Sequence, residues 1–429
     1  MSYKSQSDLY LEDNISKYPA IELLCKLGYQ YISPEECVAQ RGGFYDVILK
    51  DVLRSQLHKL NQFTYGGITY KFTAENVERA ISELDEPLTD GLVRTSEKIY
   101  DALMLGKSYP QKLVDGTIKS FNLKYIDWEH PENNVFHVTE EFSCDSLDKQ
   151  KNARPDIVLF VNGIPFTVIE CKAPTVDVDQ AVEQMIRNQG KDYIPQLFKF
   201  AQIVVATNKN AVKYATCGTG KNFWCVWREQ DTAWQNKLLD QYVVGREITE
   251  QDRNLVSLFD PGRLLTLAKY FVLYDANIKK ICRYQQFFAV EEIIKTIQQN
   301  DPAGNRQGGV IWHTQGSGKS LTMVMVAKYI LMEMSRFNPR VVIVTDRKEL
   351  DKQIAKTFAH TRLSPARATS GKHLIELVNS GSVDVITSII NKFNTVESSG
   401  LKNNSRDIFV LVDESHRSNY GEMAAKMRT

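Results

Sequence analysis

The chain has 429 residues, of which 43% are hydrophobic and 24% are charged, and its formal net charge is +1. This length suggests roughly two or three domains. No stretch approaches the ~18 consecutive apolar residues of a membrane span. The polar start has no signal-peptide core, so we expect a cytoplasmic protein with no membrane partner. The balanced charge excludes a strong whole-molecule field for nucleic acid, so any DNA contact must be local.

The seven cysteines include no Cys-x-x-Cys pair and no spacing typical of a zinc site, which indicates free thiols in a reducing compartment. Lys279, Lys280 and Arg283 form a basic cluster that could face DNA, although a solvated helix face explains such a cluster equally well.

The first half of the chain mixes helical and strand patterns. Apolar residues at helical spacing predict helices, and short apolar or alternating runs predict strands. The expected elements are, in chain order, helices at 21–27 and 51–60, a strand at 135–142, a hairpin at 156–172, a helix at 178–200 and a strand at 202–206.

The second half has a different pattern of apolar residues. A helix at 264–274 is expected between domains, after the break at 260–262. Beyond it, apolar runs of strand length alternate with helical stretches, which predicts a parallel sheet covered on both faces. These strands are expected at 309–312, 341–345, 383–387 and 408–412. The predicted organisation is a domain at 1–260, a linker helix within 261–280 and a second domain at 281–429.

The predicted hairpin carries residues suited to metal-dependent cleavage of phosphodiesters. Such chemistry needs clustered carboxylates for magnesium and benefits from a lysine near the attacked phosphate. Because side chains alternate along a strand, Glu170 and Lys172 share a face, about 6.6 Å apart along the strand. Asp156 lies on the preceding strand, so we expect Asp156 and Glu170 to hold the metal beside Lys172.

The turn of this hairpin decides whether the two acids meet. A two-residue turn at 162–163 would place Asp156 opposite Ile169, and the carboxylates would point to opposite faces. A three-residue loop at 162–164 places Asp156 opposite Glu170. A metal site shared by the two acids requires the second register. An ordinary hairpin with surface charges could have either register.

A phosphate-binding loop is the clearest motif of the second half. Residues 313–320 end in Gly-Lys-Ser, and backbone N–H groups of such a loop cradle phosphates at a helix N-terminus. Lys319 is expected to reach the β- and γ-phosphates, and Ser320 to bind magnesium through its hydroxyl. The loop residues expected to contact nucleotide are Thr314, Gly316, Ser317 and Gly318.

Two acids after the last predicted strand complete this site. Asp413 is expected to bind the nucleotide's magnesium, and Glu414 to position or activate the attacking water. The first glycine of the usual phosphate-loop pattern is His313 here. Superfamily-two helicases tolerate this departure, so it points towards them.

The nuclease residues resemble a known family. Gln189 and Tyr193 are similar to the Gln-x-x-x-Tyr element of RecB-like PD-(D/E)xK nucleases, where it orients the site and contacts DNA. Its two side chains would share a face if the segment were helical. In that fold an acid of the first helix often joins the metal site, and Glu22 is the matching position.

The second half resembles the first RecA-like lobe of a superfamily-two motor. Gln286 matches the glutamine that reads adenine in that family. Together, the two halves resemble the N-terminal part of the restriction (R) subunit of type I restriction-modification enzymes. The resemblance implies an α/β protein in which a PD-(D/E)xK domain with a mixed sheet precedes one RecA-like parallel-sheet domain.

The same resemblance implies a type I site-specific deoxyribonuclease that cuts double-stranded DNA after ATP-driven translocation. Its cofactors would be ATP and Mg²⁺. Its partners would be methylation and specificity subunits, which alone use S-adenosylmethionine. Because the chain stops at Thr429, we expect an N-terminal fragment without the second motor lobe.

Two other interpretations are open from the sequence. One is a stand-alone ATP-dependent helicase with a degenerate nuclease domain, which intact Asp156, Glu170 and Lys172 disfavour if they share a face. The other is a non-catalytic DNA-binding or assembly fragment, which the missing second motor lobe keeps open.

Overall fold

The computed structural model describes residues 13–312, 318–345, 365–393 and 405–413, together with residues 355 and 358. The chain divides into two compact units. The first comprises Met1–Val272 and Asn277–Tyr284, and the second comprises Leu273–Ala276 and Gln285–Thr429. No helix among the described residues has the length and apolar character needed to cross a bilayer.

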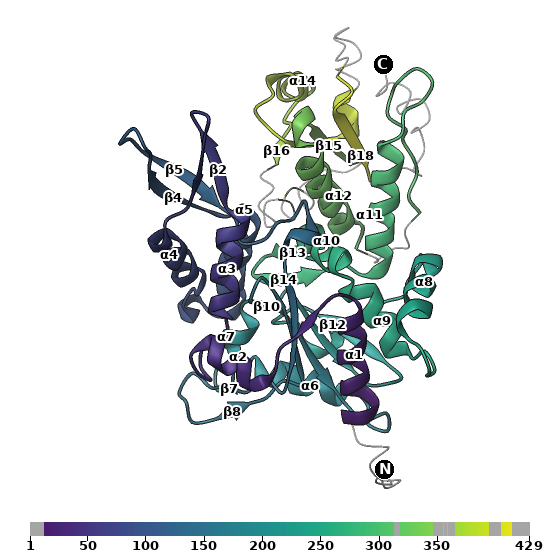
Figure 1. The fold of residues 1–429 in the computed structure, drawn as a ribbon. Coiled ribbons are helices and arrows are strands. Elements are labelled where there is room, and N and C mark those ends of the chain that lie inside the picture. Colours follow the sequence, from purple (N-terminus) through teal and green to yellow (C-terminus); the bar gives the residue numbers. More distant parts are fainter. Residues whose placement is uncertain are drawn as a thin grey trace, which may run out of the picture. The chain divides into compact units, whose positions relative to one another are not determined.

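A six-stranded mixed sheet forms the centre of the first unit, where Figure 1 labels β10 and β12. Its strand order is β1-β6-β9-β10-β11-β12. Its strands are β1 (Gln30–Tyr31), β6 (Phe136–Glu140), β9 (Ile157–Val161), β10 (Ile164–Cys171), β11 (Ile203–Thr207) and β12 (Val212–Ala215). Every residue of β9 and β10 is buried, as expected for strands covered on both faces. The predicted strands of the first half are therefore confirmed as parts of one sheet.

Helices surround this sheet. The longer ones are α1 (Tyr18–Lys26), α2 (Pro34–Arg41), α3 (Lys50–Leu60), α4 (Ala74–Leu84), α5 (Leu92–Leu105), α6 (Val178–Asn188), α8 (Thr232–Tyr242), α9 (Glu250–Phe259) and α10 (Pro261–Phe271). Helix α6 packs Val178, Ala181 and Val182 against Ala206 of β11. This contact fixes the face of the sheet on which the helix lies.

Two predicted helices have different limits in the structure. The helix expected at 178–200 is interrupted, because α6 ends at Asn188 and a short α7 follows at Pro195–Phe198. Pro195 disfavours helical geometry at the residue before it, which explains the interruption. The helix expected at 264–274 is α10, and its C-terminal part is replaced by strand β13 (Val272–Asp275).

Lys279, one of the three residues of the basic cluster near residue 280, lies neither on a DNA-facing surface nor on a solvated helix face. Lys279 lies on strand β14 (Ile278–Ile281) and is 1% exposed. Its ammonium group donates to the backbone oxygen of Ala201 at 2.8 Å and to Oε1 of Gln202 at 2.9 Å. Burial lowers the pKa of Lys279 to about 8. This lysine therefore stabilises the packing of β14 and cannot face DNA.

The second unit contains a four-stranded parallel sheet in the order β16-β17-β15-β18. Its strands are β15 (Arg340–Thr345), β16 (Ala366–Arg367), β17 (Val385–Ile389) and β18 (Ile408–Val412). Its longer described helices are α11 (Tyr284–Ile297), α12 (Lys319–Glu333) and α14 (Gly371–Ser380). Leu374 of α14 packs with Val342 and Ile386 in the core. The predicted α/β class, with a mixed sheet followed by a parallel RecA-like sheet, is confirmed.

One strand prediction in the second unit is wrong. Residues 309–312 form no strand, and the side chains of Val310 and Trp312 are 81% and 88% exposed. An apolar run becomes a strand only when another strand pairs with its backbone. No described strand pairs with this segment.

Candidate active sites

The β9–β10 hairpin turns through Asn162 and Gly163, both with positive φ (52° and 83°). Val161 pairs with Ile164 across this two-residue turn, so the three-residue loop required by the functional interpretation does not form. A type I′ turn needs positive φ at both central residues, and Asn-Gly is its preferred sequence. The side-chain amide of Asn162 also donates to the backbone oxygen of Tyr125 at 3.0 Å, which holds the turn in place.

A β-bulge then changes the register of the same hairpin. The pairing shifts between Pro165 and Thr167, so that Ile169 pairs with Ile157. One step further along this register, Asp156 lies opposite Glu170. Directly opposed residues share a face, with Cβ atoms about 5 Å apart. The bulge thus provides the register that the sequence analysis assigned to a longer loop.

Hydrogen bonding fixes the position of Asp156 at the end of β10. Its Oδ2 accepts a hydrogen bond of 2.7 Å from the backbone N–H of Cys171. Its backbone oxygen accepts from the N–H of Glu141, which follows β6, at 2.9 Å. The half-buried Asp156 is therefore held between two strands, beside the last residues of β10.

Glu170 and Lys172 differ in burial. Glu170 is fully buried and pairs with Ala206, which packs under α6, so Glu170 lies on the face that α6 covers. Lys172 is half-buried and its ammonium group donates to the backbone oxygen of Cys171 at 2.9 Å. Asp156 and Lys172, which are half-buried, therefore lie nearer the surface than Glu170.

Gln189 lies at the C-terminal cap of α6. Its side-chain Nε2 donates to the backbone oxygen of Met185 at 3.1 Å, and its Oε1 accepts from the N–H of Gly218 at 2.7 Å. Both ends of the amide are therefore engaged within the protein. Gln189 joins the end of α6 to the loop after β12, so its expected role would be one of orientation.

Tyr193 stands in the turn between α6 and α7, not on a helix, so helical spacing does not place it on a face with Gln189. The half-buried Tyr193 ring has two cations nearby. The Nζ of Lys151 lies 4.9 Å and the guanidinium carbon of Arg187 lies 5.6 Å from the ring centroid. Neither cation was expected from the sequence. Lys151 could have been noticed, because it lies five residues before Asp156 along the chain.

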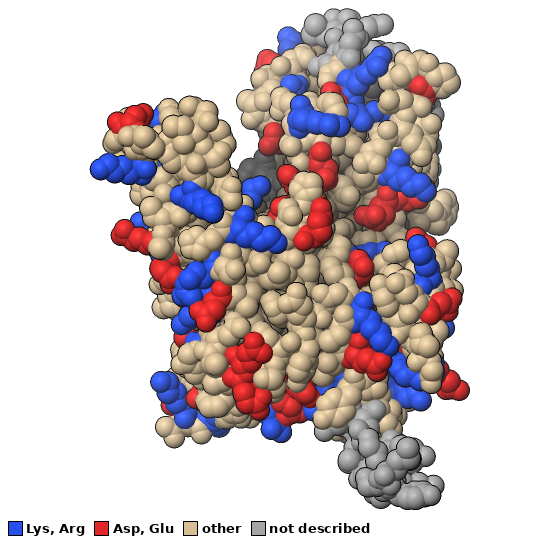
Figure 2. Space-filling model, viewed as in Figure 1, with Lys and Arg blue, Asp and Glu red and all other residues tan. Residues whose placement is uncertain are grey.

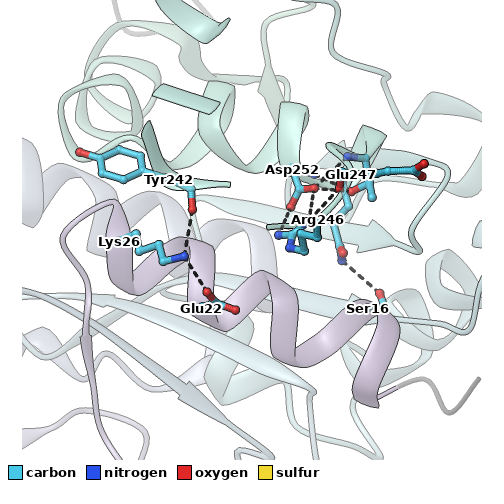
Figure 3. Close-up of polar contacts among 9 residues, drawn as sticks. Ser16, Glu22, Lys26, Tyr242, Arg246, Glu247 and Asp252 are labelled. Carbon is cyan, nitrogen blue, oxygen red and sulfur yellow. Dashed lines mark hydrogen bonds and ion pairs between the residues drawn. The ribbon is translucent and has the colours of Figure 1, made fainter. Parts of the chain in front are cut away.

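Glu22, the third acid considered for the metal, lies on α1 and is engaged elsewhere. Its carboxylate contacts the ammonium group of Lys26 at 2.6 Å, and Lys26 also donates to the backbone oxygen of Tyr242 at 3.0 Å (Figure 3). The side chain of Glu22 is 62% exposed. Within the described part of the chain, no three His, Cys, Asp or Glu side chains form a group that could hold a metal. A third acidic ligand is therefore not apparent.

The nucleotide-binding candidates of the second unit gather at the start of α12. Gly318 caps this helix with φ 86°, and Lys319 and Ser320 form its first turn. Gln286, on the first turn of α11, donates from Nε2 to the backbone oxygen of Gly318 at 3.2 Å. A Cβ atom on Gly318 would lie 2.7 Å from that Nε2. Glycine at this position therefore permits both the left-handed backbone and the close approach of Gln286.

Asp413 follows β18 and is buried, with its backbone N–H donating to the oxygen of Val344 at 2.9 Å. Strands β15 and β18 are parallel neighbours, so Asp413 lies at the carboxyl edge of the sheet, where ligands bind in open α/β sheets. The other expected contacts, Thr314, Gly316, Ser317 and Glu414, lie outside the described residues.

Comparison with known families agrees with this architecture. A profile described as the N terminus of the type I restriction enzyme R protein matches residues 9–223, which is half of the chain. The chain belongs to the type I restriction enzyme R protein family. A second profile, described as the SWI2/SNF2 ATPase, matches residues 285–429. The two matches favour the restriction interpretation over a stand-alone helicase.

Two curated relatives match nearly the whole chain. It is 29% identical to the type I restriction enzyme MjaIXP endonuclease subunit of Methanocaldococcus jannaschii, over 97% of the chain and 41% of the relative. It is also 29% identical to the HindI endonuclease subunit of Haemophilus influenzae, over 96% of the chain and 39% of the relative. The chain thus spans about two fifths of the length of these relatives.

Proposed function

We propose that this chain carries the nuclease domain and the first motor lobe of a type I restriction enzyme. In this proposal the complete protein cuts double-stranded DNA after ATP-driven translocation. The observation that supports it most directly is the register of the β9–β10 hairpin, which brings Asp156 opposite Glu170 beside Lys172. The restriction-enzyme profile that matches residues 9–223 and the ATPase profile that matches residues 285–429 agree with this proposal.

In the nuclease site, Asp156 and Glu170 would hold magnesium, because their carboxylate oxygens are the donors that this ion prefers. Magnesium commonly takes one or two protein carboxylates and completes its shell with phosphate oxygens and water, so two acids suffice. When bound, it would activate water and neutralise charge on the phosphate. Lys172 would stabilise the charge that develops on the attacked phosphate.

Gln189 and Tyr193 would support this site from its border. Gln189 would keep the end of α6 in position through its two hydrogen bonds. Tyr193, flanked by Lys151 and Arg187, would contact the DNA backbone, since aromatic rings with nearby cations suit a polyanion. Both assignments extend the resemblance to RecB-like nucleases.

In the motor lobe, Lys319 would contact the β- and γ-phosphates of ATP, and the Ser320 hydroxyl and Asp413 would hold its magnesium. Gln286 would read the adenine while its amide remains bonded to Gly318. Thr314, Gly316 and Ser317 would complete the phosphate cradle, and Glu414 would position the attacking water. The chemistry proposed for Lys319 and Ser320 rests on their place at a helix N-terminus, where phosphate is favoured.

The wider assignments belong to the same proposal. The partners would be methylation and specificity subunits, with S-adenosylmethionine used only by them, and the location would be cytoplasmic, where the DNA substrate is. The domain limits of 1–260 for the nuclease, 261–280 for the linker and 281–429 for the motor lobe are proposed with it.

The test uses the complete R protein assembled with its methylation and specificity subunits. Asp156→Ala should stop cleavage of a plasmid that carries a recognition site, because the metal loses a ligand. ATP hydrolysis and translocation should continue at the unmodified rate. Loss of ATP hydrolysis in a folded Asp156→Ala protein would contradict the division of labour, and continued cleavage would contradict the assignment of the nuclease site.

A further inference from the structure

Two hairpins of the first unit project side by side, and we refer to residues 62–71 and 107–123 together as the arm (Figure 1). One hairpin consists of β2 (Gln62–Tyr65) and β3 (Ile68–Lys71), between α3 and α4. The other consists of β4 (Lys107–Lys112) and β5 (Ile118–Leu123), after α5. Neither the family resemblance nor the proposed active sites use the arm.

Aromatic rings hold the two hairpins against one another. The rings of Phe63 and Phe121 stack with centroids 3.8 Å apart, and Tyr70 stacks on Phe63 at 5.4 Å. Lys119 lies 4.1 Å from the ring centroid of Tyr65. An isolated two-stranded hairpin is marginal in water, so this contact is what makes the arm a defined surface.

The base of the arm is fixed to the rest of the unit. The side chain of Asn61 donates to the backbone oxygen of Lys124 at 2.8 Å and accepts from its N–H at 2.7 Å. Asn76 of α4 donates to the backbone oxygen of Pro110 at 2.7 Å. The arm is therefore presented in a set orientation within its unit.

Strand pairing separates an inner face from an outer face. Phe63, Tyr65 and Phe121 lie on the inner faces, where the two hairpins meet. The outer faces carry hydroxyl, amide and ammonium groups with one proline and one isoleucine. Their members are Gln62, Thr64, Thr69 and Lys71 on the first hairpin and Ser108, Pro110, Lys112, Ile118, Ser120 and Asn122 on the second.

The arm is poor in acidic side chains although the whole chain is nearly neutral. Asp115 is the one carboxylate in residues 62–71 and 107–123, and it accepts hydrogen bonds from Thr117 within its turn. Lys71 and Lys112 are exposed, and neither forms an ion pair with any described residue. Figure 2 shows blue side chains over the arm, with red confined to one tip.

We propose that the arm binds the backbone of duplex DNA without regard to sequence. Lysine, serine, threonine, asparagine and glutamine are the side chains that contact phosphates, and the outer faces consist mainly of these. This proposal rests on the proposed function, since it takes double-stranded DNA as the substrate.

The exposed apolar side chains at the tips suit a protein partner as well as DNA. Ile68, Val114 and Ile118 are 47%, 78% and 69% exposed. The charge favours DNA, because a surface with unpaired lysines and almost no carboxylates attracts a polyanion over a long range. A protein partner would leave DNA binding unchanged when the lysines of the arm are replaced.

The arm lies away from the proposed nuclease site. Its base adjoins the turn of the β9–β10 hairpin, because the oxygen of Tyr125 accepts from Asn162. Asp156 and Glu170 stand at the opposite end of that hairpin. Five residues of β9 separate the two ends, about 17 Å at 3.4 Å per residue. The arm would hold DNA and contribute to affinity, without taking part in bond cleavage.

The experiment measures binding of a fluorescent duplex of about 30 base pairs by fluorescence anisotropy. The protein is the full 429-residue chain in EDTA without nucleotide, so neither nuclease nor motor activity contributes. In Lys71→Ala/Lys112→Ala the affinity should fall about tenfold or more at low salt. The slope of log affinity against log salt should decrease by about 1.8, from roughly 0.9 for each lost phosphate contact.

The matched control is Arg228→Ala/Lys237→Ala, which removes two exposed cations of the same unit and changes net charge equally. It should bind like the unmodified chain. Equal weakening in both double variants, an unchanged slope in the arm variant, or no duplex binding by the unmodified chain would overturn the proposal. Unchanged DNA binding with impaired assembly of the methylation subunits would also overturn it, in favour of a protein contact. None of these readouts depends on cleavage, so the proposed function is tested separately.

Discussion

The two proposed active sites differ in how the chain brings their residues together. In the first unit, Asp156 and Glu170 come from neighbouring strands, and the pairing of those strands decides whether they meet. In the second unit, Gly318, Lys319 and Ser320 are consecutive and begin one helix. A consecutive motif is readable from the sequence directly, whereas a motif divided between strands is readable only when the register is known.

The hairpin shows how sensitive the divided motif is. A shift of one residue moves every side chain of a strand to the other face. The turn at Asn162 and Gly163 alone would separate the acids, and the bulge between Pro165 and Thr167 reverses that outcome. The activity of such a site should therefore be lost on changes in the hairpin backbone as well as on changes in its acids. Nucleotide binding by the consecutive motif should be lost mainly on changes in the motif's own residues.

The largest effect is expected from the lysine of the divided motif. Lys172→Ala in the complete assembly should lower the rate of DNA cleavage at least about a hundredfold, because one stabiliser of transition-state charge is lost. ATP hydrolysis should be unchanged. The control is Lys209→Ala, a lysine of the same unit that is also half-buried. Equal loss of cleavage in both variants would show that the effect is not specific to this site.

The consecutive motif should lose affinity for ATP when its lysine is replaced. Lys319→Ala should weaken ATP binding at least about tenfold, because a charge-assisted contact to phosphate contributes about 1.5–3 kcal/mol. Isothermal titration calorimetry measures the affinity. Lys372→Ala, an exposed position on α14 of the same unit, should bind ATP normally. Unchanged affinity in Lys319→Ala would contradict the assignment of the phosphate loop.

A backbone change at the turn should affect the first unit alone. In Gly163→Ala the new Cβ would lie 2.6 Å from the backbone oxygen of Leu49, at φ 83°. We expect the free energy of unfolding to fall by about 2 kcal/mol or more, because close packing adds to backbone strain. Chemical denaturation measures it.

The control for this turn is Gly245→Ala, which has a similar φ of 80° and no neighbour within 4 Å of the new Cβ. It should lose only about 1 kcal/mol, the cost of the left-handed backbone itself. Equal destabilisation in both variants would mean that the contact with Leu49 contributes nothing.

The smallest effect is expected at Gln286. Gln286→Ala removes the hydrogen bond to the oxygen of Gly318, and a neutral hydrogen bond contributes about 1 kcal/mol. ATP affinity should therefore fall about fivefold, as measured by calorimetry. Gln285→Ala is the matched control, because Gln285 is the exposed neighbour on the same helix. Equal affinities in the two variants would remove Gln286 from the nucleotide site.

The sequence determined most strands of the six-stranded and four-stranded sheets, but none of the strands in the two-stranded sheets. Strands β6, β9, β10, β11, β15, β17 and β18 were expected because their residues are apolar and strand-length. The run at 309–312 was expected to be a strand for the same reason, and it forms none. Composition indicates which segments can be strands, but pairing with a neighbour decides which of them become strands.

For the candidate sites too, the sequence determined one part and the tertiary structure determined the other. The sequence alone identified Asp156, Glu170 and Lys172 by type and spacing, and Lys319 and Ser320 by their motif. Only the tertiary structure showed the bulge that sets the hairpin register, the burial of Lys279 and the pairing of Phe63 with Phe121 in the arm. These features depend on contacts between segments far apart in the chain. Local patterns do not encode such contacts, because packing energy depends on the partner surface as well as on the residue itself.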